Sequence, residues 1–134
     1  MAFVRAKKQG GRAYHYLVMS ERRGSSVRQK TVAYLGRYPS LAAALEGLPA
    51  EIDYYNTRAA ECAKKADRAR ADCHPAWLER NGGEVPRKRW APGTDPTRRY
   101  WAARELSELY ERRGRKLTAW LRQLEAVACS AKSL

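Results

Sequence analysis

The side chains best suited to chemistry in this chain are the arginines and lysines near its N-terminus. Residues 1–40 contain nine basic side chains and a single acidic one, Glu21, in a chain of 134 residues with a formal net charge of +13. Residues 41–82 contain six basic and seven acidic side chains, so the positive charge is concentrated and is not a uniform property of the surface. A concentrated cationic field favours a polyanionic partner. Nucleic acid is therefore the first partner to consider.

These cations lie on three runs that read as β-strands. Turns are predicted at "QGGR" and at "ERRGSS", and the short connections favour an antiparallel meander. Two-stranded ribbons fit the major groove of B-DNA, where side chains reach base edges and phosphates. A charged, solvated sheet face would place the same residues at the surface, and this alternative stays open. The predicted strands are 3–8, 13–20 and 27–35, and the candidate nucleic-acid-binding residues here are Arg5, Lys7, Lys8, Arg12, Arg22, Arg23, Arg28, Lys30 and Arg37.

Tyrosines alternate along the second predicted strand. Tyr14 and Tyr16 share a face with Val18, so both rings point to the same side of the sheet. Exposed rings there could stack on nucleobases, whereas buried rings would belong to the core. The strand is too evenly apolar for its alternation to decide between the two.

A second group of cations is interleaved with aromatic residues in "PRKRW" at 86–90 and "TRRYW" at 97–101. Basic residues supply phosphate contacts, and aromatic rings stack on unpaired bases. Tryptophans also commonly anchor a loop to a helix, which would leave the arginines solvated. The candidate residues of this group are Arg87, Lys88, Arg89, Trp90, Arg98 and Arg99.

Catalytic and metal-binding patterns are weak in this sequence. Only two histidines occur, the cysteines lack paired-ligand spacing, and neither a phosphate-binding glycine loop nor a serine elbow is present. We therefore expect a protein that is not an enzyme and that uses no cofactor and no metal. Three cysteines in helix-like sequence, together with the lack of a membrane-spanning run or a signal peptide, favour a reduced, cytoplasmic setting without a membrane partner.

Beyond residue 40 the pattern becomes helical. Ser40 is a suitable N-cap for a short helix, "LAAALEG", and a heptad seam of mostly small residues follows Pro49. A Pro/Gly-rich basic connector at 75–95 ends that helix, and Asp95 with Pro96 can start another. The first seam contains Ile52, Tyr55, Ala59, Cys62, Ala66, Ala69 and Cys73, and the apolar face of the last helix contains Ala102, Leu106, Leu109, Leu117, Trp120, Leu124 and Val127.

The sequence therefore predicts an α+β fold: a three-stranded antiparallel sheet with a short helix, followed by two long helices packed as an antiparallel hairpin. Residues 1–48 would form a basic nucleic-acid-binding module, and residues 49–134 the helical hairpin. The stretch "ERRGRK" at 111–116 interrupts the apolar face of the last helix, and Gly114 predicts either a kink or a break there. The small-residue seam could pack within the chain, or it could bind a second copy or another protein.

The run "AYHYLVMSERRGSSVRQKTVAYLGRYPSLAAAL" resembles the N-terminal segment of bacterial insertion-sequence transposases of the DDE class. The resemblance covers roughly residues 3–46, and it extends more loosely to the DNA-binding modules of integrases. It implies binding of element-end DNA through Arg22, Arg23, Arg28 and Lys30. The helical sequence of residues 49–134 departs from a transposase catalytic domain, so no active site is inferred from the resemblance.

The residues and the resemblance together favour a non-catalytic nucleic-acid-binding protein. Duplex DNA is preferred over RNA as its partner, and an accessory or regulatory role in a mobile element or phage is expected. A module that inhibits a nucleic-acid enzyme by binding it as a protein is an alternative, and RNA binding is another.

Overall fold

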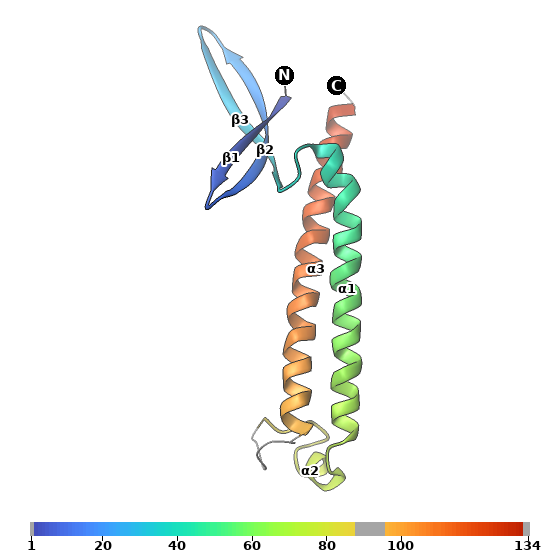
Figure 1. Ribbon diagram of the computed structural model, residues 1–134. Helices are drawn as coiled ribbons and strands as arrows, with labels where there is room; N and C mark the ends of the chain where they lie inside the picture. The colour runs from blue at the N-terminus through green and yellow to red at the C-terminus, as the bar shows by residue number, and fades with distance from the viewer. Residues whose placement is uncertain (1, 88–95, 133–134) are drawn as a thin grey trace. The chain divides into compact units, whose positions relative to one another are not determined.

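The computed structural model describes residues 2–87 and 96–132 and shows a sheet followed by helices (Figure 1). The elements are β1 (Ala2–Gln9), β2 (Arg12–Arg23), β3 (Ser26–Gly36), α1 (Leu41–Ala71), α2 (Pro75–Arg80) and α3 (Pro96–Lys132). This confirms the predicted α+β fold with its three-stranded antiparallel sheet.

The chain divides into two compact units. Unit 1 comprises Met1–Ile52 and Lys116–Leu134, and unit 2 comprises Asp53–Arg115. The boundary proposed from the sequence, between residues 48 and 49, falls inside α1. The division into domains 1–48 and 49–134 therefore stays a prediction about independently folding parts.

The sheet of unit 1 has the strand order β1-β2-β3. β1 pairs with β2 from Gln9↔Arg12 to Ala2↔Met19, whereas β2 continues along β3 to Arg23↔Ser26. Gly10 and Gly11 form the first turn with φ of 59° and 78°, which a side chain would disfavour. Residues 20–29 extend past the last β1 pair and form a two-stranded segment, which we call the ribbon.

Register decides which side chains share a face, since directly paired residues point to the same side of a sheet. Tyr16 pairs with Arg5 and with Tyr34, and Tyr14 pairs with Lys7. We call this side the tyrosine face. Two irregularities in the β2–β3 register, at His15/Tyr16 and Leu17/Val18, interrupt the ladder below the ribbon. Bulges of this kind bend a strand and increase its twist.

The core of unit 1 lies where one end of the sheet packs against α1 and the C-terminal part of α3. Its buried residues are Leu35, Ala44, Leu48 and Leu124, and Leu17 packs against them from β2. α1 begins where expected, because the Ser40 hydroxyl accepts a hydrogen bond of 3.1 Å from the Ala43 amide.

α1 does not stop at a short helix before Pro49. It is one helix of 31 residues that includes this proline. Proline inside a helix costs about 3 kcal/mol because it lacks the N–H and crowds the preceding turn. Ala44 and Leu48 are fully buried in the turns before it. Burial of these side chains offsets the cost of the proline. Helix propensities do not include this tertiary contribution, so they predict a helix end at Pro49.

The small residues of the predicted seam lie in unit 2, and their burial is confirmed. Ile52 and Tyr55, at the start of the seam, are only half-buried, and Cys73 follows the end of α1. Ala59, Cys62, Ala66, Ala69 and Cys73 are all buried. α3 runs antiparallel to this part of α1, because Asn56 lies beside Gly114, Ala59 beside Ser107, and Asp72 beside Arg99. The Ser107 hydroxyl donates a hydrogen bond of 2.9 Å to the Ala59 carbonyl, so this helix packing lies within one chain.

The predicted apolar face of α3 is wrong over its first half. Leu106 is 40% exposed and Ala102 is exposed, whereas Ser107 and Gly114 are buried. The break considered at Gly114 is also wrong, because α3 continues through this residue. A Cβ atom at 114 would lie 2.7 Å from Asn56 Oδ1. Residue size rather than hydrophobicity therefore decides which side of α3 meets α1.

The connector contains a short helix, α2, which was not predicted because proline and glycine are frequent in this stretch. His74 caps it by accepting a hydrogen bond of 3.2 Å from the Ala76 amide through Nδ1, and Pro75 occupies the first turn. The proposed N-cap of α3, Asp95, lies outside the described residues.

Candidate nucleic-acid interface

The ribbon is fully solvated. Every residue from 21 to 32 is exposed, including Arg22 and Arg23 at the tip and Arg28 on the returning strand. Ser26 closes the turn by donating a hydrogen bond of 3.0 Å to the Arg23 carbonyl. The ribbon therefore presents cations on a projection that carries no core residue.

The candidate cations of the sheet are all exposed but are divided between its two faces. Lys8 pairs with Ala13, Arg23 with Ser26, Arg28 with Glu21 and Lys30 with Met19, so these four cations lie opposite the tyrosine face. The cations on the tyrosine face are Arg5, Lys7, Arg12 and Arg22. The only acid of the first forty residues, Glu21, therefore faces away from the tyrosines.

Two cations of the second candidate group, Arg87 and Arg99, lie in unit 2 and are paired with acids. Arg87 Nη1 lies 3.6 Å from a Glu105 carboxylate oxygen, and its guanidinium stacks 4.0 Å from the centre of the Trp101 ring. Arg99 donates a hydrogen bond of 3.2 Å to Asp72. The Trp101 indole donates to the Pro86 carbonyl at 3.1 Å, which anchors the connector to α3. This arrangement fits the packing alternative for Trp101.

Three other candidates of this group, Lys88, Arg89 and Trp90, lie outside the described residues. Arg98 is exposed on the first turns of α3. The role of the whole second group in nucleic-acid binding stays a prediction.

Four aromatic rings of unit 1 form a continuous row. Ring centres are 5.2 Å apart for Tyr16 and Tyr34, 5.7 Å for Tyr34 and Trp120, and 6.3 Å for Trp120 and Tyr38. A cation covers each end, with Lys7 Nζ 5.5 Å from the Tyr16 ring centre and the Arg37 guanidinium 5.3 Å from that of Tyr38. We call these four rings the aromatic row.

Backbone contacts fix the centre of this row. Trp120 Nε1 donates a hydrogen bond of 2.8 Å to the Tyr34 carbonyl. Gly36 has φ of 58°, and a Cβ atom there would lie 3.1 Å from the Trp120 ring. A residue with a side chain would be strained at Gly36 and would also press on the indole. Glycine at this position therefore lets Trp120 approach the strand.

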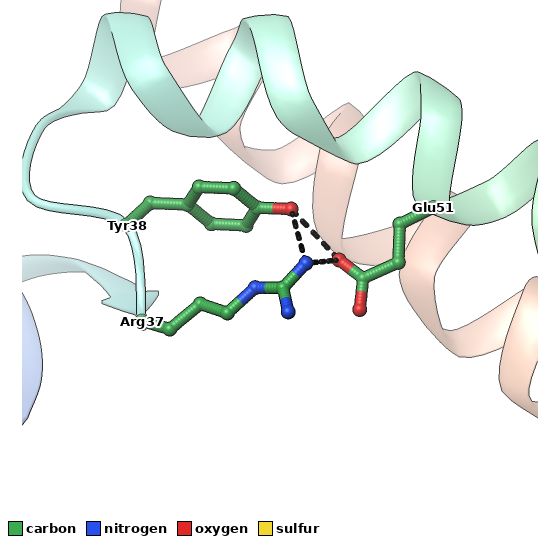
Figure 2. A network of polar contacts seen from close by, with 3 residues as sticks. All are labelled: Arg37, Tyr38 and Glu51. Carbon is green, nitrogen blue, oxygen red and sulfur yellow. Dashed lines mark hydrogen bonds and ion pairs between the residues drawn. The ribbon is translucent and has the colours of Figure 1, made fainter. Parts of the chain in front are cut away.

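Arg37, Tyr38 and Glu51 form a polar network at the other end of the row (Figure 2). The Tyr38 hydroxyl donates to Glu51 Oε2 at 2.7 Å, and Arg37 Nη2 lies 3.1 Å from the same oxygen. Burial raises the pKa of Tyr38, the hydrogen bond from Arg37 lowers it, and the contact with Glu51 raises it again. Tyr38 therefore stays protonated at neutral pH and keeps donating to the carboxylate.

A groove of unit 1 runs along these side chains. The residues that line it include Arg12, Tyr14, Tyr34, Arg37, Tyr38 and Trp120. The two arginines were predicted as phosphate contacts and Tyr14 as a stacking candidate, whereas the sequence pattern did not indicate Tyr34, Tyr38 or Trp120. Tyr34 and Tyr38 lie four residues apart in "AYLGRYPS" on either side of Arg37, which was a usable signal. Trp120 is 82 positions from Tyr38 in the sequence, and only the tertiary fold brings it into the groove.

The described residues contain no cluster of three or more His, Cys, Asp or Glu side chains that could hold a metal ion. Across residues 2–87 and 96–132, no helix is long and apolar enough to cross a membrane.

Comparison with known families links the N-terminal part of the chain to mobile-element proteins. Residues 3–66 match the model of the IS1634 family transposase, N-terminal domain. This match covers the three strands except Ala2, together with most of α1, and it confirms the resemblance to transposase N-terminal segments. No curated protein and no solved structure matches the chain.

Proposed function

Taking the similarity of residues 3–66 to a transposase N-terminal domain as the premise, we propose that this chain is a mobile-element protein whose N-terminal part binds duplex DNA. The proposed role is accessory or regulatory, and the chain binds DNA without carrying out a reaction on it. The observation that carries the proposal is the solvated, cationic two-stranded ribbon of residues 20–29.

The dimensions of the ribbon suit the major groove. Two paired strands lie about 4.8 Å apart, and four residues of each strand beyond the last β1 pair extend about 13 Å. The major groove of B-DNA is about 12 Å wide and 8.5 Å deep and admits a two-stranded ribbon. The major groove of A-form RNA is deep and narrow and does not admit one. This difference favours DNA over RNA as the partner.

Within the ribbon, the arginines divide into two expected roles. Arg22 and Arg23 at the tip contact phosphates, and Arg28 lies on the strand surface where it can reach base edges. Arginine forms a bidentate pair with guanine O6 and N7, and such pairs supply sequence discrimination. Three cysteines cannot all pair with one another within the chain, which favours a reducing setting for this function.

The test compares two double substitutions that remove equal charge. Replacing Arg22 and Arg23 with alanine should weaken duplex binding and reduce the salt slope of log affinity by about one unit for each phosphate that the variant no longer neutralises. The matched control replaces Arg112 and Arg115, which are exposed on α3 in unit 2. Affinity is measured by fluorescence anisotropy at several salt concentrations.

Equal and small reductions in affinity from both variants would show a diffuse charge effect and would contradict the ribbon proposal. Binding to a defined protein that persists at high salt would instead support the inhibitor alternative. A labelled duplex incubated with protein and Mg²⁺ should stay intact, and reproducible cleavage or strand joining would overturn the non-catalytic part of the proposal.

A further inference from the structure

The groove along the aromatic row differs from the ribbon in chemistry. The ribbon offers cations without stacked rings, whereas the groove combines Tyr14, Tyr34 and Trp120 with the guanidinium groups of Arg12 and Arg37. Tyr34 keeps 43% of its surface exposed although Trp120 stacks on its ring. Exposed aromatic rings can stack on a flat ligand, and neighbouring guanidinium groups can bind anionic groups attached to it.

Nucleobases on a sugar-phosphate chain have this combination of properties. Proteins that bind single strands use a cationic groove for the backbone and aromatic rings for the bases, and each stacked base contributes about 1–3 kcal/mol. Duplex DNA does not satisfy such a site, because its bases are already stacked and paired. The groove therefore requires nucleotides that are unpaired.

We propose that this groove binds an unpaired segment of the DNA whose duplex part is held by the ribbon. Bases stack along Tyr14, Tyr34 and Trp120, and Arg12 and Arg37 contact the phosphates. Glu51 accepts a hydrogen bond from Tyr38 and forms an ion pair with Arg37, so the carboxylate holds the guanidinium at the edge of the groove. The inference rests on the proposed function, since it assumes that the same DNA reaches both surfaces.

Strand geometry makes simultaneous binding feasible. Tyr14 and Arg22 lie eight residues apart on the same face of β2, which corresponds to about 26 Å along the strand. This distance equals roughly eight base pairs of B-DNA at 3.4 Å each. A duplex end that carries a short single-stranded extension can therefore meet the ribbon with its paired part and the groove with its unpaired part.

The experiment measures the affinity of the full chain for three DNA probes: a blunt duplex, the same duplex with a single-stranded extension, and the single strand alone. The extended duplex should bind more tightly than the blunt one. Tyr34→Leu keeps an apolar side chain but removes the aromatic ring, and it should weaken binding of the extended duplex about tenfold while leaving the blunt duplex unchanged. The matched control is Tyr54→Leu, because Tyr54 is 55% exposed and lies in unit 2.

Arg12→Ala provides a second variant that leaves the aromatic row intact, since Arg12 is exposed at the β1–β2 turn. It should also reduce affinity selectively for the extended duplex. Equal affinity of the unaltered protein for blunt and extended duplexes would refute the groove proposal and leave the ribbon untouched. Binding of the single strand without binding of the blunt duplex would refute the ribbon proposal and support the groove.

Discussion

Unit 1 and unit 2 treat their positive charges in opposite ways. Among the residues that the structure describes, four of the five ion pairs lie in unit 2 and join arginines to acids of the same unit. The fifth pair, Arg37–Glu51, is in unit 1, and none of the five includes a cation of the strands. Unit 2 therefore pairs four of its arginines with its own acids, although its net charge is still positive. The strand cations have no acidic partner among the described residues. Net charge alone would not separate these two surfaces.

The two units also differ in how much of the compared region is buried. The buried seam of unit 2 consists of small residues, so its stability depends on a close approach of two helices. The exposed part of the ribbon, residues 21–29, contains no buried residue, so its substitutions should leave folding almost unchanged. Substitutions in the two units should therefore affect different measurements.

The largest expected effect is on the stability of unit 2. Ala66 is 2% exposed in the seam, and Ala66→Leu adds volume where the helices have no room. Overpacking of this kind costs roughly 1–3 kcal/mol of unfolding free energy. Thermal or denaturant unfolding measures the change, and Ala60→Leu, at an exposed position of the same helix, is the control. Equal stability of the two variants would mean that the seam is not closely packed.

A smaller effect is expected on the salt dependence of DNA affinity. It should be larger for loss of a strand cation, which has no acidic partner in the described part of the chain, than for loss of a helix cation that is paired with an acid. Arg23→Ala should reduce the salt slope of DNA affinity by about one unit, because the variant loses one of the proposed phosphate contacts at the tip of the ribbon. Arg99→Ala removes the same charge from a residue that already contacts Asp72, so its slope should change little. Both positions are exposed, and both variants should stay within about 0.5 kcal/mol of the original stability. A larger slope change for Arg99→Ala would reverse the comparison between the units.

The smallest effect concerns pH. Burial raises the pKa of Tyr38 above its ordinary value of 10.0, so the folded state favours the neutral phenol. The resulting stability is complete below pH 10 and declines as pH rises through the higher folded pKa. Tyr38→Phe should remove part of this decline, as followed by unfolding midpoints in alkaline buffers. Burial also raises the pKa of Tyr34, so that variant keeps the contribution of Tyr34. An unchanged alkaline decline in Tyr38→Phe would show that folding does not raise the pKa of Tyr38.

The sequence predicts those parts of the fold that follow from local periodicity. Runs of β-forming residues between turn signals located the three strands, and the heptad spacing of Ala59, Cys62, Ala66 and Ala69 identified the buried side of α1. These features are predictable because strand and helix each impose a fixed period on buried positions.

The parts that escaped prediction depend on long-range packing. Ser107 is buried because its hydroxyl meets the Ala59 carbonyl 48 residues away, and no hydrophobic pattern indicates such a pair. The ribbon was predictable only as a charged turn, because β2 continues to Arg23 and β3 begins at Ser26, where the sequence predicted a turn over 21–26. The division of the cations between the two faces required the register. The aromatic row needed Trp120, whose position relative to Tyr34 is set by the tertiary fold.

The exposed outer edge of β1 has a consequence for how copies of this protein behave toward one another. β1 is an edge strand whose eight residues are all exposed, and such an edge can pair with an edge from another copy. Arg5, Lys7 and Lys8 place three positive charges along it, and like charges repel a second identical edge. The same three cations that can bind an anion thus also oppose self-association of the free protein through β1. Without that repulsion, self-association rather than unfolding would be the first sign of damage to this strand.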